Sequence, residues 1–410
     1  MTVAAEIISF GCRLNIAEAA RARDAAPAGS IVINSCAVTH EAVRQARQAV
    51  RRAHRERPEA PIIVTGCAAQ LDPDGFGALP GVAMVLGNRE KLDAAAFMLG
   101  GANDRQRVGE IMAVRDAPLA VSSSVSHTRG FVAVQNGCDH RCTFCVIPLA
   151  RGPSRSVPAG AVIEAIKAMV GAGVNEVVLT GVDLTSYGPD LPGTPTLGAL
   201  VQRILRLVPD LPRLRLSSID SIEVDPALFE VLAYESRVMP QLHLSLQSGD
   251  DLILKRMKRR HSRAQAVAFC AGLRAVRPEM VFGADLIAGF PTESAAAFSN
   301  TLKLVDDCEL TRLHVFAYSE RDGTPAARMP MVPVAVRRAR AAILRVRGSE
   351  RQAAWLAGQV GKPQRVLVEG DGLRGHAESF AAVALDRAYP RGSIIAVTAR
   401  GVAGDRLECA

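Results

Sequence analysis

In the middle of the chain, Phe131-Val132-Ala133-Val134-Gln135-Asn136-Gly137 runs directly into Cys138-Asp139-His140-Arg141-Cys142-Thr143-Phe144-Cys145. The first stretch is mostly apolar and is typical of a buried strand. The second is a short loop in which the cysteines are spaced C-x3-C-x2-C. A loop this short wraps three thiolates around one cubane iron–sulfur cluster and leaves the fourth iron without a protein ligand.

An iron without a protein ligand can chelate the amino and carboxylate groups of S-adenosylmethionine (SAM), and a low-potential cluster can pass SAM one electron. The competing interpretation is a zinc knuckle with His140 as the fourth ligand. The His140 ring would then have to fold back from within the loop, and no second C-x-x-C follows. We therefore expect Cys138, Cys142 and Cys145 to hold a [4Fe-4S] cluster that binds SAM.

Five further apolar stretches follow this strand, separated by helix-like segments. They cover 175–180, 214–218, 242–246, 281–287 and 313–317. Six such βα units predict an open (βα)6 barrel whose site lies at the carboxyl ends of the strands. The cysteine loop lies at that end of the first strand.

Glycines and polar residues at these strand ends are candidate contacts for SAM. Thr180-Gly181-Val182-Asp183 follows the second strand, and 283–293 has a spacing close to G-x-I-x-G-x-x-E. Glycine-rich turns are common at strand ends, so this pattern alone is weak. The residues to which we assign cofactor contact are Gly181, Asp183, Ser217, Gln247 and Asp285.

Three strand-like stretches near the start of the chain, at 6–10, 30–34 and 61–65, lead into Cys12, Cys36 and Cys67. Helix-like segments separate them, so the βαβ pattern predicts a parallel sheet. Because the carboxyl ends of parallel strands share one edge, the three thiols are expected to converge there. They fit a second cluster with one open iron, whereas zinc would usually need a fourth ligand, or water if catalytic. The simplest alternative is three small residues that close strand ends.

The 410-residue chain is 49% hydrophobic and 22% charged, which is typical of a globular protein of two or three domains. No stretch reaches the ~18 apolar residues of a membrane span, and the N-terminus lacks a basic signal-peptide region. We therefore expect a cytoplasmic protein with no membrane partner. In that reducing compartment the nine cysteines serve as metal ligands or core residues, and the isolated Cys270, Cys308 and Cys409 are expected to be buried.

The net charge of +8 suits a polyanionic partner without identifying one. Lys255-Arg256-Met257-Lys258-Arg259-Arg260-His261 borders the predicted site, and a second basic run lies between Arg337 and Arg351. Charge runs usually line a solvated helix face, and this interpretation stays open for both. The residues that we expect to contact RNA phosphates are Lys255, Arg256, Lys258, Arg259 and Arg260.

From about Gly361 the pattern changes to short strands with glycine turns, at 364–369, 380–385 and 393–397. This pattern predicts a small β-barrel, which has few aromatic residues for base stacking and would alternatively be a plain packing module. The predicted domains are 1–100, a linker at 101–127, the open barrel at 128–355 and the small barrel at 356–410.

Together these regions resemble one family along nearly the whole chain, the radical-SAM methylthiotransferases. That family combines an N-terminal three-cysteine domain, a radical-SAM barrel and a C-terminal TRAM domain that contacts RNA. Three phrases resemble its MtaB-like branch, which acts on threonylcarbamoyladenosine in tRNA: 10–15 with Glu18, 178–188 and 244–251. The isopentenyladenosine branch usually has G-C-Q-M-N where this chain has Gly11-Cys12-Arg13-Leu14-Asn15, and the branch that modifies a ribosomal protein differs there too.

The resemblance implies an α/β protein with a parallel N-terminal domain, a partial TIM barrel and a TRAM-like β-barrel. It implies methylthiolation of C2 of N6-threonylcarbamoyladenosine at position 37 of tRNA, with SAM and two [4Fe-4S] clusters. Cys138, Cys142 and Cys145 would hold the SAM-cleaving cluster. An auxiliary cluster that supplies or carries sulfur would be held by Cys12, Cys36 and Cys67. One SAM would methylate that sulfur, and a second would give the deoxyadenosyl radical that abstracts hydrogen from C2.

The implied partners are tRNA, a sulfur source and a low-potential electron donor of the flavodoxin or ferredoxin type, since no flavin or nicotinamide motif is visible. The nearest alternative is the same chemistry on N6-isopentenyladenosine of tRNA or on an aspartate of a ribosomal protein. An alternative of another class is a non-catalytic iron–sulfur protein that binds RNA or senses redox state. The C-x3-C-x2-C loop on a barrel strand argues against it.

Overall fold

The N-terminal part of the chain forms one five-stranded parallel sheet. In the computed structural model, which describes residues 4–98, 104–122 and 128–410, its strands lie in the order β1-β2-β3-β4-β5. They are β1 (Glu6–Ser9), β2 (Ile31–Ser35), β3 (Ile62–Gly66), β4 (Val82–Leu86) and β5 (Gln106–Arg107), and the helices are α1 (Arg13–Ala25), α2 (His40–Glu56), α3 (Cys67–Leu71) and α4 (Pro73–Gly77). The predicted parallel sheet is confirmed, and β4 and β5 extend it.

Apolar side chains cover both faces of this sheet. On one face Ala22 of α1 packs against Val32 and Ile63, and on the other Val50 of α2 packs against Ile33. Every residue of β2 and β3 is buried. Since both faces are covered by helices, the carboxyl edge of the strands is the place left for polar or reactive side chains.

The middle of the chain is the predicted open barrel of parallel strands. Its strands are β7 (Gly130–Ala133), β10 (Glu176–Thr180), β11 (Arg213–Leu216), β12 (Ser218–Ile219), β13 (Gln241–Gln247), β14 (Val281–Ala288) and β15 (Leu310–Ala317). Together with β6 (Ala120–Ser122) they fall into two hydrogen-bonded groups, β11-β10-β7-β6 and β12-β13-β14-β15, and the division falls at Ser217. The third predicted strand is thus two short strands.

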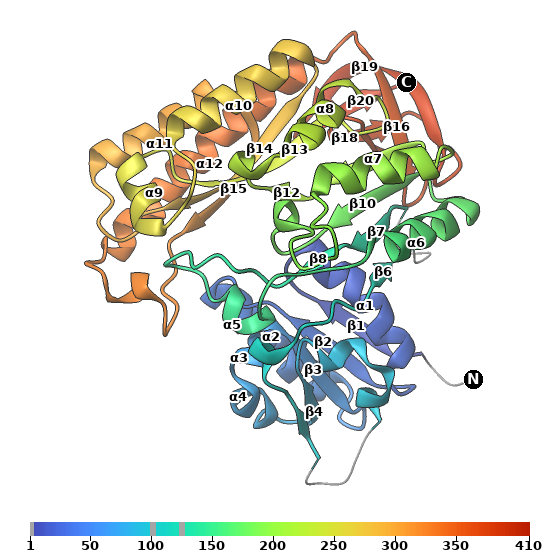
Figure 1. The fold of residues 1–410 in the computed structure, drawn as a ribbon, viewed down its shortest axis with the longest axis vertical. Coiled ribbons are helices and arrows are strands. Elements are labelled where there is room, and N and C mark those ends of the chain that lie inside the picture. Colours follow the sequence, from blue (N-terminus) through green and yellow to red (C-terminus); the bar gives the residue numbers. More distant parts are fainter. Residues whose placement is uncertain (1–3, 99–103, 123–127) are drawn as a thin grey trace.

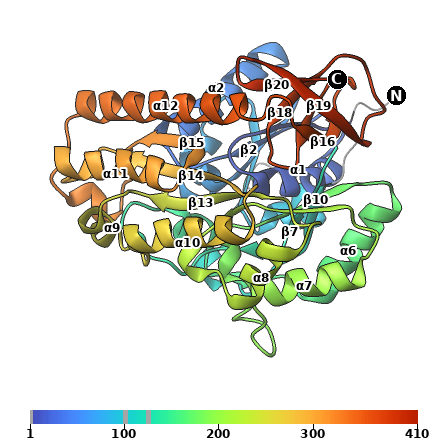
Figure 2. The ribbon, with the colours of Figure 1, turned by 90° about the horizontal axis from the view of Figure 1, so that it is seen from above.

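Helices cover the outer side of the barrel, as Figure 2 shows for α10, α11 and α12. They are α6 (Ala159–Gly171), α7 (Leu197–Leu207), α8 (Pro226–Tyr234), α10 (Arg263–Val276), α11 (Ala295–Asp307) and α12 (Val334–Ala357), with the short α5 (Ile147–Arg151) and α9 (Asp251–Met257) at strand ends. The inward side of these helices and the outward side of the strands share one apolar core. The other side of the strands therefore faces the barrel interior.

The predicted linker contributes strands to both neighbouring sheets. Gln106 and Arg107 pair with β4 as β5, and β6 (Ala120–Ser122) pairs antiparallel with β7. Residues 101–103 and 123–127 of the linker lie outside the described residues. A short hairpin of β8 (Gln135–Asn136) and β9 (Arg155–Ser156) flanks the cysteine loop.

The C-terminal residues form a closed five-stranded barrel, as expected for a TRAM-like domain. Its strands are β16 (Pro363–Glu369), β17 (Arg374–Ala377), β18 (Ala382–Leu385), β19 (Ile394–Ala403) and β20 (Arg406–Cys409), in the order β16-β17-β18-β20-β19. Figure 1 shows this red barrel at one end of the open barrel, with the blue N-terminal sheet on a different side. Both outer parts therefore contact the central one.

The three isolated cysteines are buried, as expected. Cys270 and Cys308 belong to the core of the open barrel, and Cys409 belongs to the core of the C-terminal barrel. Among the described residues, no helix is both long and apolar enough to cross a membrane.

Candidate active site

The first three cysteines lie at the carboxyl edge of the N-terminal sheet and are called the N-terminal triad here. Cys12 precedes α1, Cys36 follows β2, and Cys67 begins α3 directly after β3. Gly11 has a φ of +92°, and a Cβ there would lie 2.9 Å from Cys36 Sγ, so only glycine lets the chain pass this close to the thiol. Burial above all, with a smaller contribution from the nearby Cys67 and Cys12, raises the pKa of Cys36 to about 11.

Cys138, Cys142 and Cys145, the loop triad, lie at the carboxyl end of the first barrel strand. The loop is closed by backbone hydrogen bonds from Cys138 N to Gly152 O (3.1 Å) and from Cys145 N to Cys142 O (3.1 Å). Burial raises the pKa of Cys145 to about 12. Burial, and then the charge of Asp183, raise the pKa of Cys138. Thiols in such a setting ionise when a cation binds them, which fits three ligands to a metal cluster.

The segment after the loop triad contacts the N-terminal triad. Arg151 of α5 lies in this segment, and its Nε donates to Cys67 Sγ at 3.2 Å. On the barrel side Arg259 Nη1 donates to Cys142 Sγ at 3.6 Å. Each triad therefore has one guanidinium group that can stabilise thiolate charge.

A buried polar network connects the two domains at this place. Arg151 Nη1 donates to Glu18 Oε1 (2.8 Å) and Nη2 to Asn15 Oδ1 (2.7 Å), and Lys91 Nζ lies 2.6 Å from Glu18 Oε2. Burial alone would raise the pKa of Glu18, but Arg151 and Lys91 lower it to about 2. Sequence analysis missed Arg151 and Lys91, since neither lies in a motif.

The predicted SAM contacts are spread over the strand ends and the barrel interior. Gly181 and Asp183 follow β10, and Asp183 accepts a hydrogen bond from Ser186 Oγ (2.8 Å), pairs with His140 Nε2 (2.7 Å) and lies 3.7 Å from Cys138 Sγ. Ser217 is buried at the break between β11 and β12, and its Oγ has no hydrogen-bond partner within the described part of the chain. Gln247 ends β13 with a left-handed φ of 67°. Among the predicted SAM contacts, Asp183 is therefore the residue that lies beside the loop triad.

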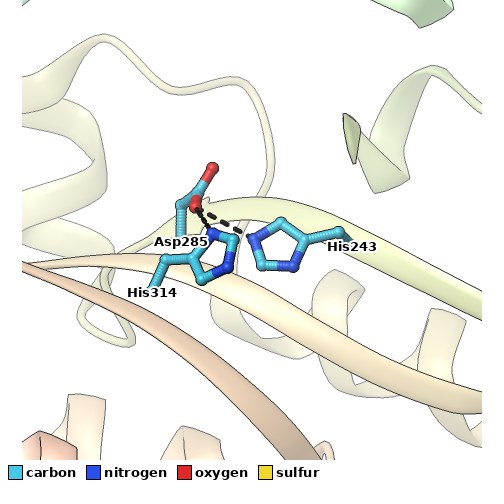
Figure 3. Close-up of side chains that lie close together, drawn as sticks. All are labelled: His243, Asp285 and His314. Carbon is cyan, nitrogen blue, oxygen red and sulfur yellow. Dashed lines mark hydrogen bonds and ion pairs between the residues drawn. The ribbon is translucent and has the colours of Figure 1, made fainter. Parts of the chain in front are cut away.

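Asp285 lies within β14 and holds two histidines that sequence analysis missed. Its Oδ1 is 2.9 Å from His243 Nε2 on β13 and 3.1 Å from His314 Nδ1 on β15. Figure 3 shows both rings directed at this one oxygen, with ring centroids 4.3 Å apart. Burial would raise the pKa of Asp285, but the hydrogen bonds from both histidines hold it below its usual range. Period-two alternation along each strand would have placed these side chains on the inward face, but it does not show that they meet.

The five basic residues at 255–260 differ in their surroundings. Lys255 and Lys258 are exposed, Arg256 Nη1 donates to Thr292 Oγ1 (2.6 Å), and Arg260 is paired with Glu223. Arg259 departs from the predicted phosphate contact: its side chain is 8% exposed and bonds to Asp220 Oδ2 (2.7 Å) and Ser245 O (2.7 Å). It faces the loop triad because Asp220 and the Cys142 thiol attract the guanidinium group.

Comparison with known proteins gives one consistent result. Residues 132–305 match the radical SAM superfamily and residues 4–87 match the uncharacterized protein family UPF0004. The chain is 48% identical to threonylcarbamoyladenosine tRNA methylthiotransferase MtaB of Rickettsia prowazekii, covering 98% of this chain and 96% of the relative. It is 34% identical to tRNA-2-methylthio-N(6)-dimethylallyladenosine synthase of Erythrobacter litoralis, covering 89% and 86%.

Solved structures share the fold at low sequence identity. Radical S-adenosylmethionine methyltransferase TsrM from Kitasatospora setae matches with a TM-score of 0.55 and 14% identity, over 84% of this chain and 69% of that one. At this identity the likeness concerns the fold alone. It agrees with the open barrel of parallel strands described above.

Proposed function

Because this chain belongs to the MtaB-like radical-SAM methylthiotransferases, we propose that it methylthiolates C2 of N6-threonylcarbamoyladenosine at position 37 of tRNA. The observation that carries the proposal is that two thiol triads lie at the carboxyl ends of strands from two different domains, and that Arg151, in the segment after the loop triad, donates to Cys67 of the N-terminal triad. A radical-SAM enzyme needs one cluster, and a second triad beside it is explained by a reaction that also inserts sulfur.

The loop triad would hold the [4Fe-4S] cluster that binds SAM, and the N-terminal triad would hold an auxiliary [4Fe-4S] cluster. When bound, the first supplies the electron that cleaves SAM and the second supplies the sulfur. Arg259 and Arg151 each donate to one thiol of a triad and so favour its deprotonated, metal-binding form. SAM would be contacted by Gly181, Asp183, Ser217, Gln247 and Asp285.

The reaction needs partners that the chain must recruit. A low-potential donor of the flavodoxin or ferredoxin type would supply electrons, and a sulfur source would refill the auxiliary site. The tRNA would lie along the basic segment after β13, where Lys255 and Lys258 are exposed and Arg256 and Arg260 lie beside them. Arg259 is directed into the site and would act on the loop triad instead.

The comparisons support the choice of threonylcarbamoyladenosine. Identity is 48% to a relative named for that nucleoside and 34% to one named for dimethylallyladenosine. The test is to delete the gene in its host, digest total tRNA to nucleosides and quantify methylthio-adenosines by mass spectrometry. Wild-type protein, Cys142→Ala, Cys36→Ala and the matched control Cys270→Ala, a thiol outside both triads, are then returned to the deletion strain.

We expect selective loss of 2-methylthio-N6-threonylcarbamoyladenosine, restored by wild type and Cys270→Ala but by neither triad variant. Loss of the isopentenyl relative instead would keep the chemistry and overturn the substrate. Unchanged tRNA nucleosides would overturn the tRNA proposal and direct attention to a ribosomal protein.

A further inference from the structure

Four arginines surround one aromatic ring between the three parts of the molecule. The guanidinium carbons of Arg215, Arg129, Arg13 and Arg312 lie 4.8, 4.9, 5.3 and 5.3 Å from the centroid of Phe380. In the same order, the four arginines come from β11, the residue before β7, the first residue of α1, and β15. Phe380 comes from the turn before β18. The φ of Phe380 is +66°, a conformation that a bulky residue adopts at a cost. The surrounding structure therefore holds the ring in this place.

Two of the four guanidinium groups are neutralised by carboxylates. Arg129 Nε and Arg215 Nε lie 2.6 and 2.9 Å from Glu176 Oε1, and Arg129 is also paired with Glu369. Within the described ranges, neither Arg13 nor Arg312 has a carboxylate within ion-pair distance or a hydrogen-bond acceptor. A cation over a ring face gains about 0.5–2 kcal/mol, which does not replace a counter-ion for a partly buried charge.

The surroundings of these two charges are unfavourable. The guanidinium group of Arg13 shares the ring of Phe380 with three other guanidinium groups, so like charges lie close to it. Burial lowers the pKa of Arg312, although the charge of Asp405 acts against this shift. A carboxylate in contact with either group would supply a counter-ion that the described residues do not place within ion-pair distance.

Arg13 is adjacent in the chain to the candidate active site, and Arg312 lies on a strand whose inward face carries His314. Arg13 directly follows Cys12 of the N-terminal triad. Arg312 precedes His314 by two residues on β15, so both side chains face the barrel interior. There His314 joins His243 and Asp285 (Figure 3), and its side chain is 65% exposed.

Gly283 of β14 lets Arg312 and His243 approach this strand closely. A Cβ there would lie 2.7 Å from Arg312 O and 2.9 Å from His243 Nδ1. Arg312 and the histidine cluster are therefore packed together on the inward face of neighbouring strands.

We propose that Arg13 and Arg312 bind the carboxylate of the threonylcarbamoyl group and so select the threonylcarbamoyl substrate over adenosines with an apolar N6 substituent. This inference rests on the proposed function and names the residues of its specificity. A carboxylate forms paired charge-assisted hydrogen bonds with guanidinium groups. An isopentenyl group offers no hydrogen-bond acceptor, so its binding would leave both guanidinium groups desolvated and unpaired. A site discriminates more strongly against a substrate that leaves buried charges unpaired than against one that differs only in apolar bulk.

The test compares three anticodon stem-loop RNAs with reconstituted, reduced wild-type enzyme and SAM. They carry at position 37 either threonylcarbamoyladenosine, the same nucleoside with its carboxylate converted to a carboxamide, or isopentenyladenosine. We expect kcat/KM for the carboxamide to be about 10- to 100-fold below that for the free acid, the size of one or two lost charge-assisted hydrogen bonds. This arm uses no variant and therefore does not depend on folding.

The second arm uses Arg312→Gln and Arg13→Gln, with Arg338→Gln on the exposed face of α12 as the matched control. The two site variants should lose about 10- to 100-fold on the free acid and little on the carboxamide, while the control behaves as wild type. Formation of 5′-deoxyadenosine without RNA should be unchanged, which shows that the SAM site is intact.

The outcomes separate the two proposals. No methylthiolation of threonylcarbamoyladenosine by wild type, with activity on isopentenyladenosine, would overturn the proposed function itself. Equal rates on acid and carboxamide would overturn the role of the arginines while leaving that function in place. An equal loss on all three RNAs in the variants would assign the arginines to the tRNA backbone and would also overturn the inference.

Discussion

Arg151 lies at the end of α5, in the segment after the loop triad, yet its Nε atom donates to Cys67 of the N-terminal triad at 3.2 Å. We predict that Arg151→Met lowers the free energy of unfolding by about 3 kcal/mol, because Asn15 and Cys67 lose a buried donor and Glu18 keeps Lys91 as its one cationic partner, beside Asn136. The variant should also bind less iron, and its iron content should resemble that of Cys36→Ala.

The measurement is iron and sulfide per chain after anaerobic reconstitution, together with chemical denaturation. Arg338→Met, an exposed arginine on α12, is the control and should retain the wild-type iron content. Full iron content in Arg151→Met would show that the guanidinium group is not needed for the N-terminal triad.

Single residues differ in how far the sequence could predict them. The six triad cysteines follow from spacing and from their place after strands, because ligand chemistry restricts which residue types can serve. Arg151 meets Glu18 across 133 positions, and His243, Asp285 and His314 come from three strands. Such contacts arise only from tertiary packing, so no local pattern indicates them.

The cysteine loop depends on one glycine at its start. Gly137 has a φ of +72°, and a Cβ there would lie 1.9 Å from the carbonyl oxygen of Pro153. We predict that Gly137→Ala destabilises the protein by about 2–4 kcal/mol and reduces iron binding by the loop triad, since the hairpin of β8 and β9 must move apart.

Thermal unfolding and iron analysis of Gly137→Ala provide the check. Gly160→Ala in the first turn of α6, where no atom lies within 4 Å of the new Cβ, should be neutral or stabilising by up to about 1 kcal/mol. The prediction is wrong if both variants unfold at the same temperature as wild type.

The first residue of β10, Glu176, is buried among Arg129, Arg213 and Arg215. Burial alone would raise its pKa, but these arginines hold it well below the usual 4.5. The ionised carboxylate therefore contributes stability above that usual value, and the contribution is lost as the pH falls through the lowered pKa. We predict that Glu176→Gln lowers the unfolding free energy by about 3–5 kcal/mol near neutral pH.

The same variant should have a flatter stability profile than wild type below the usual carboxyl pKa of 4.5. Urea denaturation at several pH values measures this, with Glu164→Gln on the exposed side of α6 as the control, since its side chain is 72% exposed. Parallel profiles for Glu176→Gln and wild type would contradict the assignment.

Whole elements were predicted where their hydrophobic pattern was long. The sequence indicates the mostly buried strands β2, β3, β13 and β14 within a few residues. β5 and β6 were taken as linker because each is short and gains its hydrogen bonds from a neighbouring sheet. The break at Ser217 was missed because it reflects the hydrogen-bond register, whereas the side-chain pattern continues across it.

Two exposed lysines lie near the candidate site. Lys255 and Lys258 are exposed on and after α9, and they are expected to neutralise RNA phosphates. We predict that Lys255→Gln and Lys258→Gln each weaken tRNA binding and each reduce the slope of log K against log salt by about 1.

Fluorescence anisotropy with labelled tRNA at several salt concentrations measures the slope. Lys303→Gln, an exposed lysine on α11, is the matched control. An unchanged slope for both site variants would place the RNA on another face.

The sequence alone could not predict how the N-terminal sheet, the open barrel and the C-terminal barrel are arranged relative to one another. The C-terminal barrel accepts hydrogen bonds from Arg213 Nη2 at Arg365 O (2.9 Å) and from Arg215 Nη2 at Glu378 O (3.1 Å). These arginines belong to a barrel strand that is buried, where a sequence pattern predicts apolar residues. Composition alone could not show that they meet another domain.

The contact of Arg151 with Glu18 and Cys67 has a consequence for the life of the protein in a cell. The Arg151 side chain joins two domains and also faces a thiol of the N-terminal triad. A ligand that binds this triad therefore stabilises the association of the two domains. By thermodynamic linkage, domain association stabilises binding of that ligand by the same free energy. Molecules made during iron starvation would then separate their domains more often and be degraded sooner. The abundance of the protein would follow iron supply without any dedicated regulator.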